Sequence, residues 1–195
     1  MIGKVHLWLG LSSGLVVFIL GVTGCIWAFK EELQNRIYAD QKFVKTDEFD
    51  EVLQVSKSME AAQRTISEDC PIQLVYIKNC RECSYYFQHY SSSENVDGIW
   101  YWDEIKSYKG VYMNPLTAEV LAAEDKTFEF FEFVLKLHWS LLLVNDIGQP
   151  IVGTATIIFI IMLITGLILL VAQKAKERHP TQYLVPMEKN DSLEA

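Results

Sequence analysis

The sequence predicts an integral membrane protein: an α-helical hairpin of two transmembrane helices with a small α+β domain inserted between them, outside the membrane. Residues 5–29 and 147–173 contain no charged side chain. As a helix, each run is long enough to cross a hydrocarbon core of about 30 Å. Between them, residues 30–126 show a helical pattern of apolar residues and then an alternating one, which predicts an α+β domain.

The first run, residues 5–29, is predicted to be transmembrane helix 1 rather than a cleaved secretory signal. It is far longer than the apolar core of a signal, about 7 to 15 residues, and it ends at Lys30 without a small-x-small cleavage site. His6 lies one turn before Gly10. A histidine at this place in a span is either a functional residue or an interfacial anchor, and the sequence leaves both open.

Small residues recur on one side of this helix and predict a shallow trough along it. Such a trough suits close packing of another helix, and it would also admit a flat group such as a porphyrin against the backbone. The residues are Gly10, Ser13, Gly14, Gly21 and Gly24.

The inserted domain is predicted to be one helix on an antiparallel sheet. Apolar residues from Asp47 to Ile66 recur at helical spacing, and Thr46 or Asp47 suits the N-cap. From Pro71 onward the period changes to alternation, which predicts strands. We expect these at residues 72–78, 85–90, 98–101, 110–113 and 119–122, with a turn at 114–117.

The charge of the chain is concentrated in the polar loop. Residues 31–149 contain 11 Lys or Arg and 21 Asp or Glu, a net charge of −10. An acidic surface of this kind excludes nucleic acid as a partner and attracts cationic species such as iron.

Positive residues lie close to the spans on the side of the two termini: Lys4 precedes the first span, and Lys174, Lys176 and Arg178 follow the second. Both termini, including the tail 174–195, are therefore expected to be cytoplasmic. The tail is expected to be disordered after Pro180.

Two of the four cysteines form a CxxC pair in the predicted hairpin turn. Position 84 is serine where a c-type haem attachment motif needs histidine, and no second pair completes a zinc site. In an oxidising compartment Cys80 and Cys83 are expected to form a disulfide, with a redox role as the alternative. The pairing of Cys25 and Cys70 stays open.

Residues 127–146 are predicted to form an amphipathic helix at the outer membrane interface. His138 falls on its apolar face. Its alternatives are a functional ligand or a core histidine bonded to a backbone carbonyl. A helix break is expected at the start of transmembrane helix 2, residues 147–173, over Asn145, Asp146, Gly148, Gln149 and Pro150.

Three segments resemble the PepSY-associated transmembrane helix family: HLWLGLSSGLVVFILGVTGCIWAF, VYMNPLTAEVL and LHWSLLLVNDIGQPIVG. The resemblance implies a PepSY-like extracytoplasmic domain and location in the bacterial inner membrane. It also implies a haem-dependent reductase of ferric iron or ferric siderophores with haem b as cofactor. The family's haem-ligand candidates correspond to His6 and His138. Many relatives have four spans, whereas this chain has two.

The two-span length leads to a hypothesis of a homodimer with haem at its interface. The two ligating nitrogens of a bis-histidine haem lie about 4 Å apart, but His6 and His138 are expected at opposite membrane faces. In a dimer about an axis along the membrane normal, each histidine would meet its mate. His179 is a rival ligand for the inner haem, in a poor place beside Pro180. The cytoplasmic electron donor is unknown.

Two other classes of function stay open. The chain could be a membrane-anchored PepSY-like binding or sensing module without haem, or an accessory subunit of a transporter. The sequence contains no nucleotide fingerprint or phosphate loop, which argues against an enzyme that uses NAD or ATP by itself.

Overall fold

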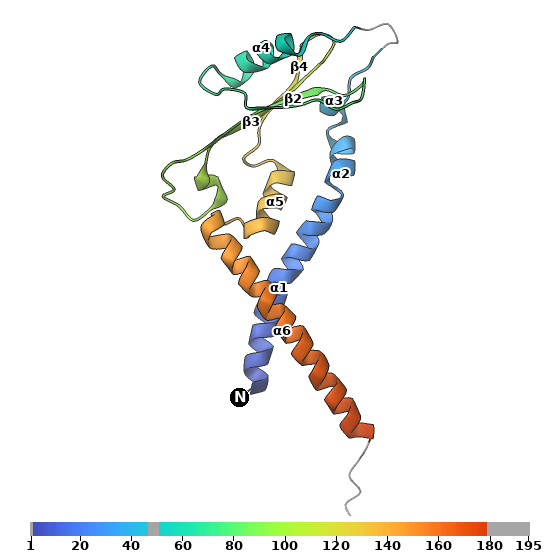
Figure 1. Ribbon diagram of the computed structural model, residues 1–195, viewed down its shortest axis with the longest axis vertical. Coiled ribbons are helices and arrows are strands. Elements are labelled where there is room, and N and C mark those ends of the chain that lie inside the picture. Colours follow the sequence, from blue (N-terminus) through green and yellow to red (C-terminus); the bar gives the residue numbers. More distant parts are fainter. Residues whose placement is uncertain (1, 47–50, 179–195) are drawn as a thin grey trace, which may run out of the picture.

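The computed structural model describes residues 2–46 and 51–178, and Figure 1 shows their arrangement. Helix α1 (Ile2–Ala28) and helix α6 (Asn145–Arg178) cross as an X. The short helix α5 (Phe130–Ser140) lies between their diverging ends, beneath a sheet domain. Helices α2 (Lys30–Ile37) and α3 (Ala39–Lys42) connect α1 to this domain.

Two helical segments are long and apolar enough to cross a membrane: Lys4–Ala28 and Asn145–Ala175. Most of their large apolar side chains are exposed, unlike those of the core helix of a soluble protein. An apolar surface of this extent is what helices surrounded by lipid present. This part of the predicted fold, two candidate spans around an α+β domain, is confirmed.

The crossing of the two long helices uses part of the predicted trough of small residues. A Cβ atom at Gly14 would lie 3.7 Å from Phe159 of α6, and one at Gly10 would lie 4.0 Å from Met162. Small residues here let the helices approach closely. Helix packing therefore accounts for this half of the trough.

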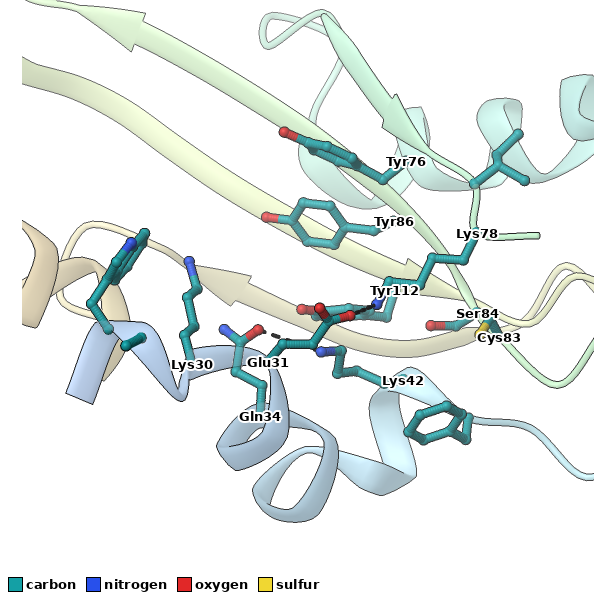
Figure 2. Close-up of a pocket in the computed structure, with 14 residues that line it drawn as sticks. Lys30, Glu31, Gln34, Lys42, Tyr76, Lys78, Cys83, Ser84, Tyr86 and Tyr112 are labelled. Atoms are coloured by element: carbon teal, nitrogen blue, oxygen red, sulfur yellow. Dashed lines mark hydrogen bonds and ion pairs between the residues drawn. The ribbon is translucent and has the colours of Figure 1, made fainter. Parts of the chain in front are cut away.

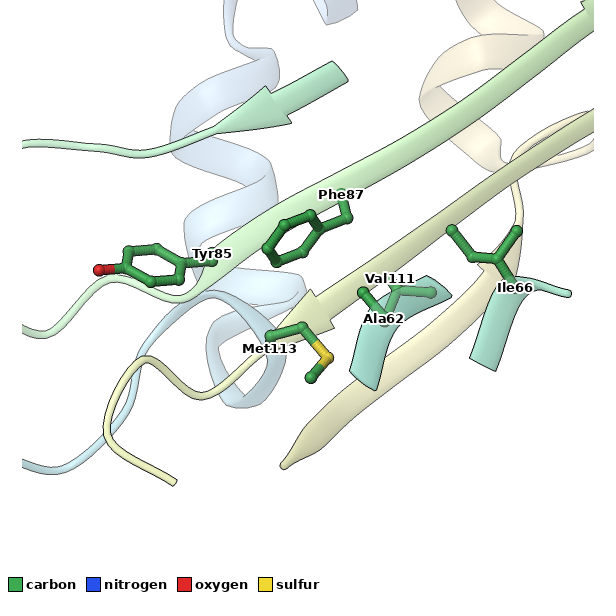
Figure 3. Packing of buried hydrophobic residues seen from close by; sticks show 6 residues of the cluster. All are labelled: Ala62, Ile66, Tyr85, Phe87, Val111 and Met113. Carbon is green, nitrogen blue, oxygen red and sulfur yellow. The ribbon is translucent and has the colours of Figure 1, made fainter. Parts of the chain in front are cut away.

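The sheet has four antiparallel strands in the order β1 (Leu74–Tyr76), β2 (Tyr85–Ser92), β3 (Ile105–Met113) and β4 (Val120–Asp125). One face packs on helix α4 (Val55–Ile66). Figure 3 shows this core: Ala62, Ile66, Tyr85, Phe87, Val111 and Met113. Because side chains alternate along a strand, residues 86 and 112 point to the opposite face, toward the junction of α1 and α2.

The helix predicted from Asp47 to Ile66 in the inserted domain begins later than expected. Helix α4 starts at Val55, and residues 51–54 have no regular structure. The Leu53 N–H donates to the Pro115 carbonyl at 2.9 Å, so a tertiary contact at the β3–β4 turn holds this segment out of the helix. The rest of the predicted first turns, residues 47–50, lies outside the described residues.

The predicted strand at residues 98–101 is wrong. The segment leads into a 3₁₀ helix, η1 (Tyr101–Glu104), and the Trp100 N–H donates to the Asp103 carboxylate at 3.0 Å. Its backbone bonds go to the loop between α5 and α6: the Val144 N–H donates to the Ile99 carbonyl at 2.9 Å. The third strand, β3, is instead longer than predicted. Strand β1 is shorter than predicted.

The break between the predicted amphipathic helix and the second apolar helix lies at residues 141–144, earlier than the expected 145–150. Helix α6 begins at Asn145, where the Glu104 carboxylate accepts bonds from the Asn145 N–H (2.8 Å) and side-chain amide (3.1 Å). Pro150 lies within the helix. The helix continues through residues 174–178, the start of the predicted tail, while residues 179–195, with His179 and Pro180, lie outside the described residues.

Candidate functional site

The candidate site is built on helix α5, whose first turn is held by a buried carboxylate. Glu129 accepts hydrogen bonds from the N–H groups of Phe131 and Glu132, both at 3.1 Å. Tyr38, at the junction of α2 and α3, donates to the same carboxylate at 3.0 Å. An acidic N-cap stabilises the positive end of a helix. Glu129 thereby ties α5 to the chain that leaves α1.

The last turn of α5 is held against the start of α6. Leu141 ends the helix in the left-handed conformation, with φ of 55°, and its N–H donates to the Leu137 carbonyl at 3.1 Å. Ser140 is fully buried and donates to the Leu143 carbonyl at 2.7 Å. A Cβ atom at Gly148 would lie only 2.1 Å from the Ser140 carbonyl oxygen. Only glycine allows α6 to approach this closely.

The His138 side chain projects from α5 onto α1. Its Nδ1 atom lies 3.0 Å from the Leu20 carbonyl oxygen and 3.1 Å from the Thr23 hydroxyl, which itself donates to the Ile19 carbonyl at 2.7 Å. A carbonyl oxygen only accepts, so Nδ1 carries the proton. In the neutral ring Nε2 then holds a free lone pair, the form of histidine that ligates metals.

The backbone of α1 leaves room for this ring at one residue. A Cβ atom at Gly24 would lie 3.1 Å from Cε1 of His138 and 3.6 Å from Nδ1. The sequence placed Gly24 in the trough, but it did not identify Thr23 or the Leu20 carbonyl as partners of His138. A backbone acceptor leaves no mark in the sequence, and Thr23 had no feature that distinguishes it from other small polar residues in a span.

His6 lies far from this contact. It is half-buried near the start of α1, whereas His138 contacts α1 at Leu20 to Gly24. At least 14 helical residues separate the two levels, which is about 21 Å along the axis. One chain therefore does not bring both histidines to one metal ion. Among the described residues there is also no group of three or more His, Cys, Asp or Glu side chains that could hold a metal.

Between the two helix contacts, one position of the trough is open. Gly21 lies on the same side of α1 as Gly14, which meets α6, and Gly24, which meets His138. No atom lies within 4 Å of the place where its Cβ would be. The surface of α1 at Gly21, beside His138, is therefore not covered by any other described part of the chain.

The remaining candidates lie in the sheet domain and in α1. Cys80 and Cys83 form a disulfide in the β1–β2 connection. Cys25 and Cys70 are free thiols. The ring of His89 is buried, and its Nδ1 donates to the Pro71 carbonyl at 2.8 Å, which gives this histidine a structural role.

The fold defines a class of protein with two candidate membrane spans around an inserted α+β domain. Residues 4–187 match the family model described as PepSY-associated TM region, and the chain belongs to this family. The family resemblance seen in the sequence is thus confirmed. No curated protein matches the chain.

Proposed function

We propose that this chain is one subunit of a b-type cytochrome of the bacterial inner membrane. In this proposal a homodimer passes electrons from a cytoplasmic donor to ferric iron or a ferric siderophore on the outer side. The observation that supports it most directly is the state of His138, whose Nδ1–H is bonded to a backbone carbonyl and whose Nε2 is free to ligate.

The residues around His138 fit a haem group. Haem b, when bound, would supply a one-electron Fe(III)/Fe(II) couple. The Leu20 carbonyl fixes the tautomer and orientation of the His138 ring, as the outer partner of a ligating histidine commonly does. Gly24 lets the ring lie close to α1, and Gly21 leaves open space beside it for a flat group.

The proposal calls for a dimer because, among residues 2–46 and 51–178, each chain offers one histidine at each of the two haem levels. The separation of about 21 Å along α1 means that His6 and His138 cannot serve one haem within a chain. About a two-fold axis along the membrane normal, His138 of two copies would meet near the outer ends of the spans. His6 of two copies would meet near the other ends. One or two haems per dimer are compatible with this arrangement.

The proposed orientation follows from charge. Lys4 lies at the start of α1, and Lys174, Lys176 and Arg178 lie at the end of α6. Positive residues close to spans favour the cytoplasmic side. Both termini would then be cytoplasmic, and the sheet domain would lie in the periplasm.

The test is a reduced-minus-oxidised visible spectrum of the detergent-purified chain beside His6→Ala and His138→Ala. We expect a low-spin b-type spectrum that each substitution weakens. His89→Gln is the matched control, because this histidine is bonded within the sheet domain, and it should keep the spectrum. Absence of haem from every preparation, even after reconstitution, would contradict the proposal.

A second candidate function is a membrane-anchored binding module without haem. It is supported by a cavity of about 450 Å³ in the outer part of the molecule, within the size range of small-molecule sites. A colourless protein that still binds a ligand there would favour this second function.

A further inference from the structure

The cavity lies where the end of α1 meets the sheet domain. Figure 2 shows it between the helices α2 and α3 on one side and the uncovered face of the sheet on the other. Trp27 of α1 also lines it. Cys83, which forms the disulfide with Cys80, and Ser84 lie at one end of it (Figure 2). Trp27 is the next-to-last residue of α1, so the cavity is at the outer end of this span.

Three tyrosines make the sheet side of the cavity. Tyr76, Tyr86 and Tyr112 are successive partners across β1, β2 and β3. Their ring centroids are 5.9 Å and 4.7 Å apart, and their hydroxyl groups point the same way (Figure 2). A row of aromatic rings offers dispersion contacts and edge or offset stacking to a flat ring.

The residues that line the cavity are mainly positive, whereas the loop 31–149 as a whole is negative. Lys30, Lys42 and Lys78 line it, and Glu31 is the one acidic residue among the described residues that do. Lys78 pairs with Glu31. Among the lining residues, positive charges therefore outnumber negative ones by two, within a loop whose net charge is −10.

The two remaining lysines have weak partners. The ammonium group of Lys42 donates to the Gln34 amide oxygen at a long 3.4 Å. That of Lys30 lies 3.8 Å from the Glu132 carboxylate and 3.9 Å from the centre of the Trp27 ring. Burial lowers the pKa of both side chains, because their charge is only partly compensated. An anion placed between them would supply the missing compensation.

We infer that this cavity binds a small organic anion with a flat aromatic ring. Its carboxylate or equivalent acid group would lie at Lys30 and Lys42, and its ring would lie against the tyrosine row. The inference does not depend on haem. It differs from the expectation that the acidic loop collects cations, because binding follows the local charge of the cavity and not the net charge of the domain.

The first experiment is calorimetric titration of the full chain in nanodiscs of zwitterionic lipid with 2-naphthoate as the probe. The neutral analogue 2-naphthalenemethanol and the non-aromatic anion cyclohexanecarboxylate are titrated in parallel. We expect 2-naphthoate to bind at least about tenfold more tightly than either analogue. The neutral analogue loses the charge-assisted contact with the lysines, and cyclohexanecarboxylate loses the aromatic stacking on the tyrosine row. Equal affinity for the neutral analogue, or no binding of 2-naphthoate, would overturn the inference.

Variants then locate the site. Lys42→Gln should weaken binding of 2-naphthoate by about tenfold. Lys57→Gln, on the exposed side of α4 and across the sheet, is the matched control and should bind like the parent chain. Gln34→Phe keeps every charge but fills the cavity, so it should abolish binding while the circular dichroism spectrum stays unchanged. Unaltered binding by both Lys42→Gln and Gln34→Phe would place the probe elsewhere and overturn the inference.

One further variant separates this inference from the proposed cytochrome function. His138→Ala should lose haem and still bind 2-naphthoate with parental affinity, because His138 does not line the cavity. Loss of 2-naphthoate binding by this folded variant would contradict a site independent of haem.

Discussion

The Nδ1 atom of His138 lies 3.0 Å from the carbonyl oxygen of Leu20, and this bond joins α5 to α1. The acceptor is a backbone atom, so no substitution at Leu20 removes it. The orientation of the imidazole is therefore determined by how α5 sits on α1. The residues that fix this packing can be tested individually.

Gly24→Val is expected to displace the His138 ring and to destabilise the protein by about 1–3 kcal/mol, the usual cost of overpacking. The physical reason is that even a Cβ atom at Gly24 would lie 3.1 Å from the ring. Thermal unfolding in detergent measures the effect. Gly153→Val in α6 is the control, because its Cβ position is open and it lies outside the proposed haem site. It should keep the parental melting temperature, and an equal loss in both variants would contradict the contact.

Gly148→Ala is expected to lower stability by about 3 kcal/mol or more. Its Cβ would lie 2.1 Å from the Ser140 carbonyl oxygen, a backbone atom that moves only if α5 and α6 separate. The matched control is Gly153→Ala in the same helix, whose Cβ would meet no atom within 4 Å. Denaturant or thermal unfolding compares the two. Similar stability of the two variants would show that the end of α5 does not pack on α6 in this way.

Tyr38→Phe is expected to change the alkaline stability of the protein. Burial, and then the bond to Glu129, raise the pKa of Tyr38 to about 12 from an ordinary value of 10.0. The unfolded chain therefore loses this proton first, so the stabilisation is present below pH 10 and is lost as the pH rises toward 12. The free energy of unfolding of the parent chain should approach that of Tyr38→Phe over this range.

At neutral pH the same substitution should cost about 1 kcal/mol, the usual value of one hydrogen bond within a folded protein. Tyr76→Phe, on the exposed edge strand, is the control and should leave stability unchanged at neutral pH. A difference between the parent chain and Tyr38→Phe that does not vary between pH 9 and pH 12 would argue against the bond to Glu129.

Thiol titration of the denatured protein should give two free thiols per chain before reduction and four after it. The two are Cys25 and Cys70, since Cys80 and Cys83 are joined. Replacing Cys80 and Cys83 together by serine should lower stability by about 2 kcal/mol, as expected for a cross-link across a very short loop. Four free thiols without reductant would contradict the disulfide.

The sequence predicted the long elements better than the short ones. Long uncharged runs identify helices such as α1 and α6, because lipid requires twenty or so apolar residues. A short strand needs no minimum run of apolar residues, so its position depends on partners elsewhere in the chain. Residues 98–101 alternate like a strand, yet their hydrogen-bond partners are Leu142 and Val144, far along the chain. Likewise, residues 51–54 continue the helical pattern, but Leu53 is bonded to Pro115.

By itself the sequence determined the two candidate spans and an antiparallel sheet with one helix on it, because these follow from local composition and period. The family followed from the resemblance of three sequence segments. Only the tertiary structure decided which atom fixes the orientation of the His138 ring. It also decided that lysines gather around one cavity in a loop that is acidic as a whole. The Leu20 carbonyl has no sequence signature. The lysines of the cavity come from α2, α3 and the β1–β2 connection, which only folding brings together. Net charge is a sum over the chain, whereas a binding site depends on which charges converge.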